Sequence, residues 1–169
     1  MTPNYLVILA SALIPFAIAF IWFHKSVFGG TKWSAMSEMP AEKAATPVKT
    51  GKMLLSLLLN VLLAMGMFQY SIHENGVFGM VGGNPELMME GTAAAFLAEY
   101  GGHFHTWTHG LAHGLGATLC FALPVLGYVV IFEKKTAKYF WVYLGYWWIS
   151  LTLMSIVLSV WGATPMVLS

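Results

Sequence analysis

Histidine is the residue type whose spacing in this sequence points most clearly to chemistry. Four of the six histidines fall close together, at His103, His105, His109 and His113. The last three are spaced by four residues, and on an α-helix such a step turns the side chain by only about 40°. The sequence therefore predicts that His105, His109 and His113 form a stripe along one helix face.

The stripe allows three kinds of chemistry. Imidazole is the commonest transition-metal ligand, and two imidazoles four residues apart can hold one ion. The same residues can ligate haem iron or pass protons. A metal ion needs three or four ligands, so we expect His73 or Glu99 to complete the set of His105, His109 and His113.

A fourth interpretation is purely structural. A neutral histidine can hydrogen-bond across a helix interface and hold a bundle together. The partners that the sequence offers on the other segments are Ser71, His73, Thr152, Ser155 and Ser159, with Glu99 within reach from the external loop. From the sequence alone this structural role is the one we favour, and the metal, haem and proton-handling roles stay open beside it.

Small residues accompany the stripe. Gly110 and Gly114 form one small-xxx-small pair, and Ala112 and Gly116 form another. Such pairs let helix backbones approach closely in lipid. We therefore expect Gly110, Gly114 and Gly116 to form a packing face next to the histidines.

The composition indicates which kind of molecule must position these residues. Of the 169 residues, 58% are hydrophobic and only 9% are charged, whereas soluble domains average about 25% charged residues. This excludes nearly every soluble enzyme, and without arginine or a basic stripe it also excludes nucleic-acid binding. The single cysteine excludes a cysteine-based metal cage. An integral membrane protein in contact with the lipid bilayer remains.

Four apolar segments are long enough to cross a bilayer core of roughly 30 Å. Backbone amides in lipid must be satisfied within their own segment, so these spans must be helices. The sequence predicts an all-α four-helix bundle with spans at about 5–23, 53–72, 106–132 and 139–161. Pro15 and Pro124 should bend the first and third of them.

The lysines predict the orientation. All eight lie in the connections 24–52 and 133–138, and none lies in the connection 73–105 or in either tail. By the positive-inside rule the lysine-bearing loops are cytoplasmic, and both termini and loop 73–105 lie outside. Within that loop, Glu86–Tyr100 is predicted to form a short helix on the membrane surface, and Pro40 is predicted to begin a short helix on the cytoplasmic side.

The order of several short motifs resembles a bacterial family of small membrane proteins, domain of unknown function 1761. The motifs are Trp22-Phe23-His24-Lys25-Ser26-Val27-Phe28-Gly29 with Trp33, His73 with Gly79-Met80 and Gly82-Gly83, His109-Gly110-Leu111-Ala112-His113-Gly114, Pro124, Phe132-Glu133-Lys134-Lys135 and Gly145-Tyr146-Trp147. The resemblance covers almost the whole chain, supports four spans and implies location in a bacterial inner membrane. It implies no known reaction.

The chain offers no recognisable catalytic set, because it lacks aspartate and its spans contain no acidic residue. The leading hypothesis is a non-enzymatic inner-membrane protein that acts as a homo-oligomer or as an accessory subunit of a larger membrane complex. The alternatives are a metal- or haem-binding membrane protein that uses the histidine stripe, and a small transporter or proton-conducting protein.

Overall fold

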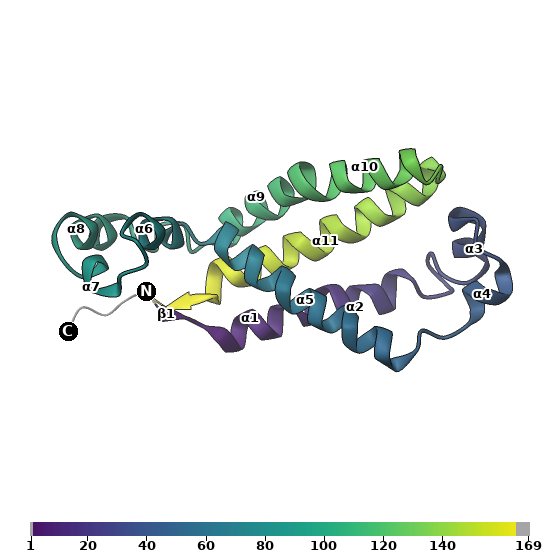
Figure 1. Cartoon of the computed structure of the whole chain (residues 1–169), viewed down its shortest axis with the longest axis horizontal. Helices are drawn as coiled ribbons and strands as arrows, with labels where there is room; N and C mark the ends of the chain where they lie inside the picture. The colour runs from purple at the N-terminus through teal and green to yellow at the C-terminus, as the bar shows by residue number, and fades with distance from the viewer. Residues whose placement is uncertain (1, 165–169) are drawn as a thin grey trace.

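The computed structural model describes residues 2–164 and consists of long helices joined by short ones (Figure 1). Four helical rods are long and apolar enough to cross a membrane. They comprise α1 (Tyr5–Ser11) with α2 (Leu13–Trp22), α5 (Thr50–Ser71), α9 (Trp107–Ala117) continuing through the π-helical turn η1 (Thr118–Ala122) into α10 (Leu123–Phe132), and α11 (Ala137–Trp161). The predicted all-α, four-helix fold is confirmed.

Regular helix is interrupted just before each of the two prolines that were expected to bend a span. A proline ring has no N–H and clashes with the carbonyl four residues earlier. The first rod breaks at Ala12, three residues before Pro15, and η1 opens a wider turn immediately before Pro124. The carbonyl of Pro15 accepts a hydrogen bond of 3.0 Å from the Tyr146 hydroxyl, which ties the first rod to α11.

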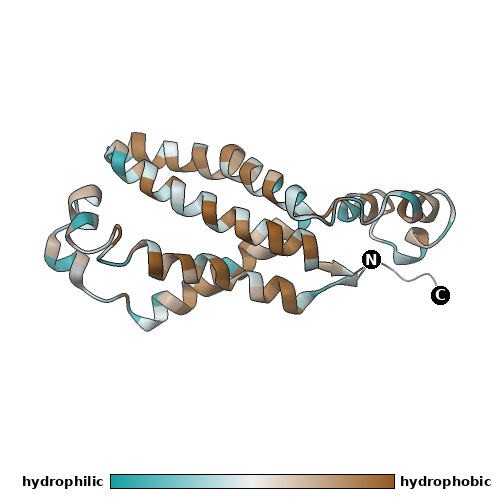
Figure 2. Ribbon diagram, turned by 180° about the vertical axis from the view of Figure 1, so that it is seen from behind, coloured by the Kyte–Doolittle hydropathy of each residue, from teal (hydrophilic) through white to brown (hydrophobic). Residues whose placement is uncertain are grey.

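Helix α11 is the central element of the bundle. It packs most extensively against α9 and also contacts α1, α2 and α5. Its side chains Leu151, Met154 and Leu158 are buried in the core together with Ala64 and Phe68 of α5. The outward faces stay strongly apolar: Leu54, Leu58 and Leu62 of α5 are each more than half exposed, as expected of a surface that meets lipid. Figure 2 shows that hydrophobic residues predominate along the long helices.

The connecting segments gather at the two ends of the bundle, which we call the histidine end and the lysine end. The histidine end carries residues 72–106, with α6 (Glu74–Met80), α7 (Pro85–Met88) and α8 (Gly91–Tyr100). The lysine end carries residues 23–49 and 133–136, with α3 (Thr31–Ser37) and α4 (Ala41–Ala45). The predicted surface helix over 86–100 is divided in two, because α7 ends at Met88 and Gly91, the first residue of α8, adopts a positive φ of 58°.

The two ends of the described chain meet at the histidine end. Strands β1 (Thr2–Pro3) and β2 (Ala163–Thr164) form a short antiparallel pair there. We predict that both termini lie on the outer side of the membrane. The terminal residues themselves, Met1 and 165–169, are not among the described residues, but the neighbouring segments that form β1 and β2 are. The pairing places both neighbouring segments on the same side of the bundle as α6–α8 (Figure 1).

Candidate metal centre

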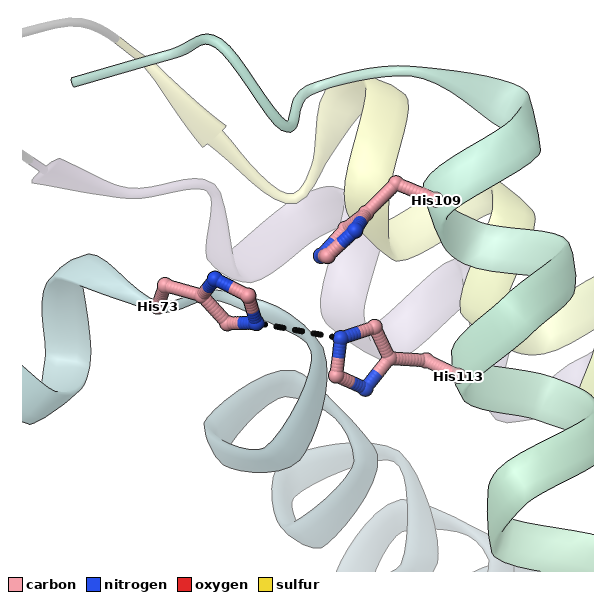
Figure 3. Close-up of side chains that lie close together, drawn as sticks. All are labelled: His73, His109 and His113. Carbon is pink, nitrogen blue, oxygen red and sulfur yellow. Dashed lines mark hydrogen bonds between the residues drawn. The ribbon is translucent and has the colours of Figure 1, made fainter. Parts of the chain in front are cut away.

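Three imidazoles converge where the histidine end meets the bundle (Figure 3). His109 and His113 project from successive turns of α9, and His73 comes from the link between α5 and α6. One nitrogen from each of the three lies within 4.8 Å of the other two. The Nε2 atoms of His73 and His113 are 3.1 Å apart and share a hydrogen bond.

The three rings pack edge to face against one another. Ring centroids are 4.3 Å apart for His109 and His113, 4.7 Å for His73 and His109, and 5.2 Å for His73 and His113. Two aromatic side chains enclose the group: Phe104 lies 5.2 Å from His73 and 5.0 Å from His109, and Tyr70 lies 4.8 Å from His113. The imidazoles therefore sit in an aromatic enclosure that is open on the side of His73, whose side chain is exposed.

Two polar atoms of this group are buried without a partner. Nε2 of His109 and Nδ1 of His113 have no hydrogen-bond partner among the described residues. A buried polar group without a partner costs roughly 1–3 kcal/mol. Each of these nitrogens carries either a lone pair or a proton, so each could still accept or donate one hydrogen bond or, when unprotonated, bind a metal ion.

The hydroxyl groups that were expected to satisfy the histidines are used elsewhere or lie apart. The hydroxyls of Ser71 and Ser155 bond each other at 2.8 Å and so join α5 to α11. Those of Thr152 and Ser159 are buried and make no hydrogen bond to a described residue. The histidine that does find a histidine partner is His113, through His73.

The prediction that His105 belongs to the helical stripe is wrong. Helix α9 begins at Trp107, because the Thr106 hydroxyl caps it by accepting the His109 N–H at 3.2 Å. His105 therefore precedes the helix and points elsewhere. Its Nε2 lies 3.1 Å from Oε1 of Glu74.

Glu74 connects the start of α6 to the segment before α9 through its contacts with His105 and Gly102, which we call the Glu74 latch. Its carboxylate also accepts the Gly102 N–H at 3.0 Å. Burial on its own would raise the pKa of Glu74, but the hydrogen bonds from His105 and from backbone N–H groups outweigh it and lower the pKa from 4.5 to about 2. Glu74 is thus an ionised, largely buried carboxylate directly next to His73 in the chain.

The remaining candidates are not part of the cluster. Glu99 is exposed on α8 and belongs to no close group of possible ligands among residues 2–164. His103 is also exposed and lies beside the ring of Tyr100, with centroids 5.9 Å apart. The structure therefore brings together His73, His109 and His113 of the expected ligands, and leaves out His105 and Glu99.

The glycines lie where α9 crosses its neighbours. A Cβ on Gly110 would lie 2.5 Å from Cα of Ile156, and one on Gly114 would be closer still to Cα of Thr152, so both face the α11 backbone. Gly116 faces α5 instead, where a Cβ would lie 2.9 Å from the Tyr70 hydroxyl. This close approach holds one side of α9 against α11 while His109 and His113 turn toward His73.

The donor set fits a single transition-metal ion. Two imidazole nitrogens bound tetrahedrally at 2.0–2.1 Å are about 3.3–3.4 Å apart, close to the 3.1 Å between His73 and His113. Side-chain rotation would bring the third nitrogen inward from within 4.8 Å. Because the rings already touch one another, a flat porphyrin could not lie between two of them with an imidazole on each face, so the convergence of all three favours an ion over a haem with two histidine ligands.

Sequence reasoning missed Glu74, Phe104 and Tyr70 as parts of this site. The signal for Glu74 was its position immediately after His73 at the end of a span. Phe104 and Tyr70 carried no such signal, because an aromatic residue near a span end is usual for a membrane protein.

Comparison with known proteins places the chain in one family. A family model described as "Protein of unknown function (DUF1761)" matches residues 6–159, which is nearly the whole chain. Neither the curated proteins nor the solved structures gave a match. The match covers all four rods and the three converging histidines. The chain belongs to the DUF1761 family.

Proposed function

We propose that this protein binds one divalent transition-metal ion in the membrane, held by His73, His109 and His113. The observation that carries the proposal is the convergence of three imidazoles from two separate segments, with two of their nitrogens buried and unpartnered. A structural site would need only one hydrogen bond per ring, which His73 and His113 supply to each other, so the proposal rests on the further nitrogens, Nε2 of His109 and Nδ1 of His113, that no described residue satisfies. This reverses the preference that the sequence alone suggested.

The ligand chemistry narrows the class of ion. Imidazole suits zinc, copper, nickel and iron, whereas magnesium and calcium prefer oxygen ligands. The cluster contains neither thiolate nor carboxylate. Its three ligands are neutral imidazoles, so they would not balance the positive charge of the ion. Three protein ligands also leave a fourth position free for water or an exchangeable ligand.

The proposed setting is the outer face of a bacterial inner membrane. This orientation rests on the lysines, which all lie at or next to the lysine end. The metal centre would then stand at the external boundary of the bundle. The alternative of a homo-oligomer or accessory subunit stays a prediction, because it needs an interface that no described contact singles out.

A metal titration tests the proposal. The protein, purified in detergent with a histidine-free affinity tag and stripped with chelator, is titrated with Co²⁺ and Zn²⁺. We expect one ion per chain and visible Co²⁺ absorption typical of a low-coordinate nitrogen site. Glutamine keeps hydrogen bonding but ligates poorly, so His73→Gln, His109→Gln and His113→Gln should each lose stoichiometric binding.

His103→Gln is the matched control, because His103 is exposed at the same end of the bundle but lies outside the cluster. It should bind one ion like the wild type. Absence of binding in the wild type, or equal binding in all four variants, would contradict the proposal.

A further inference from the structure

A small cavity adjoins the metal centre at the histidine end. Its volume is about 110 Å³, and it lies between α6, α8 and the loop that leads to α9. His73, the exposed one of the three ligands, forms part of its wall. The cavity and the proposed ion site therefore share one side chain, and the other two ligands lie behind it.

The walls of the cavity are of two kinds. Val77, Phe96, Leu97 and Phe104 make most of the surface apolar. The one acidic group in the wall is Glu74, whose Oε1 lies 3.1 Å from Nε2 of His105 and accepts the Gly102 N–H at 3.0 Å. A single negative charge between low-dielectric walls concentrates the electric field along the cavity.

The charge of the surrounding surface has the same sign. The segment 73–105 carries four glutamates, Glu74, Glu86, Glu90 and Glu99, and no lysine, whereas all eight lysines lie elsewhere. A cation that approaches from the histidine end meets a negative surface and is not repelled by any lysine of that segment. Charge arranged in this way raises the local concentration and the association rate of oppositely charged ligands.

We propose that this cavity is the access route by which a divalent transition-metal ion from the solvent at the histidine end reaches His73 and passes on to His109 and His113. The inference rests on the proposed function. Glu74 attracts the ion, the mostly apolar walls hold it weakly, and His73 is the one imidazole in the wall that it meets. Phe104 and Tyr70 flank other sides of the cluster, against His109 and His113 respectively.

Loading kinetics test the route separately from the site. Co²⁺ is mixed with chelator-stripped protein in a stopped-flow instrument and its absorption is followed. Leu97→Trp fills the cavity and replaces no ligand, so we expect its association rate to fall well below that of the wild type while the equilibrium affinity stays the same. Leu97→Ala is the matched control at the same position and should load at least as fast as the wild type.

Glu74→Gln tests the charge and remains informative if the tryptophan variant fails to fold. Glutamine keeps an oxygen to accept the Gly102 N–H but removes the charge. We expect slower loading that depends less on ionic strength than in the wild type, whereas Glu86→Gln, on the same segment outside the cavity, should retain most of the wild-type rate. Wild-type loading rates in both Leu97→Trp and Glu74→Gln, with one ion still bound, would overturn the route alone. A wild type that binds no ion would overturn the site and the route together.

Discussion

The two ends of the bundle hold their connecting segments by different means. At the lysine end, Trp33 of α3 packs against Phe23 and Tyr143, with ring centroids 5.2 Å from each. The polar groups there are satisfied: the Trp22 indole N–H donates to the Val142 carbonyl at 3.0 Å, and the Thr136 hydroxyl donates to the Met36 carbonyl at 3.0 Å.

The histidine end also uses rings in contact, but its rings are imidazoles and its polar groups are not all satisfied. Nitrogens of His109 and His113 are buried without a partner in the described chain. The aromatic cluster is therefore complete as packing, whereas the imidazole cluster keeps two nitrogens that a bound ion would satisfy. The proposed function thus assigns packing to the lysine end and chemistry to the histidine end, which is the chemical end of this small bundle.

The largest effect should come from breaking the helix crossing that supports the chemical end. Gly114→Leu puts a bulky side chain against the backbone of α11 at Thr152, and lipid offers no hydrophobic drive to restore the contact. We expect loss of folded protein, or of ion binding together with a large fall in thermal stability, as measured by size-exclusion chromatography and thermal unfolding in detergent.

Gly127→Leu is the matched control on the same rod, toward the lysine end. Nothing lies within 4 Å of a Cβ at Gly127, so its side chain should enter lipid and leave both stability and ion binding near wild type. If Gly114→Leu behaves like Gly127→Leu, the histidine centre does not depend on the close crossing of α9 and α11.

Bound metal should stabilise the protein through the histidine end only. An ion that binds the folded state alone stabilises it by about 2.7 kcal/mol at a hundredfold excess over its dissociation constant. We expect Zn²⁺ to raise the melting temperature of the wild type, but not that of His113→Gln. Trp33→Ala at the lysine end should lower the melting temperature measured without Zn²⁺ but leave the increase caused by Zn²⁺ as large as in the wild type. Loss of that increase would show that the two ends are coupled.

Acid should open the Glu74 latch. Because the folded-state pKa of Glu74 lies at about 2, below its ordinary 4.5, its contacts contribute stability that is present above pH 4.5 and is lost as the pH falls toward 2. The amide resonance of Gly102, which donates to this carboxylate, should move with a midpoint near pH 2. A midpoint at 4.5, or the same titration in Glu74→Gln, would show that the latch is absent.

The smallest effect is expected from removing one hydrogen bond between two rods. Tyr146→Phe deletes the bond to the Pro15 carbonyl, and such bonds inside membrane proteins average about 0.6 kcal/mol. We expect a small fall in unfolding free energy with unchanged ion binding, measured by denaturant titration. A loss of ion binding would contradict the separation between the α2–α11 contact and the histidine centre.

The sequence was sufficient for the fold because lipid imposes simple rules. Apolar length and the absence of charge located four helices whose bounds lie close to those observed, from α1 at Tyr5 to α11 ending at Trp161. Those rules do not describe the connections, where local chemistry decides. The division between α7 and α8 depends on the backbone of Gly91, and α3 and α6 carry no strong periodic pattern.

The candidate site could be predicted only in part for the same reason. The spacing of His109 and His113 on one helix face follows from helix geometry, and it holds. His105 is not part of the stripe, because Thr106 is a good N-cap and the helix begins only after Thr106. The sequence named His73 and Glu99 as possible partners, but the choice of His73 depends on how α5 packs against α9, which is a long-range contact that no local pattern contains.

The most direct test of the central claim is X-ray absorption spectroscopy at the zinc edge of protein loaded with one equivalent of Zn²⁺. The account predicts a first shell of nitrogen or oxygen at 2.0–2.1 Å with outer-shell scattering from three imidazoles in the wild type, and loss of this three-imidazole signal in His73→Gln. A zinc ion without imidazole scattering, or a spectrum that His73→Gln, His109→Gln and His113→Gln leave unchanged, would contradict it.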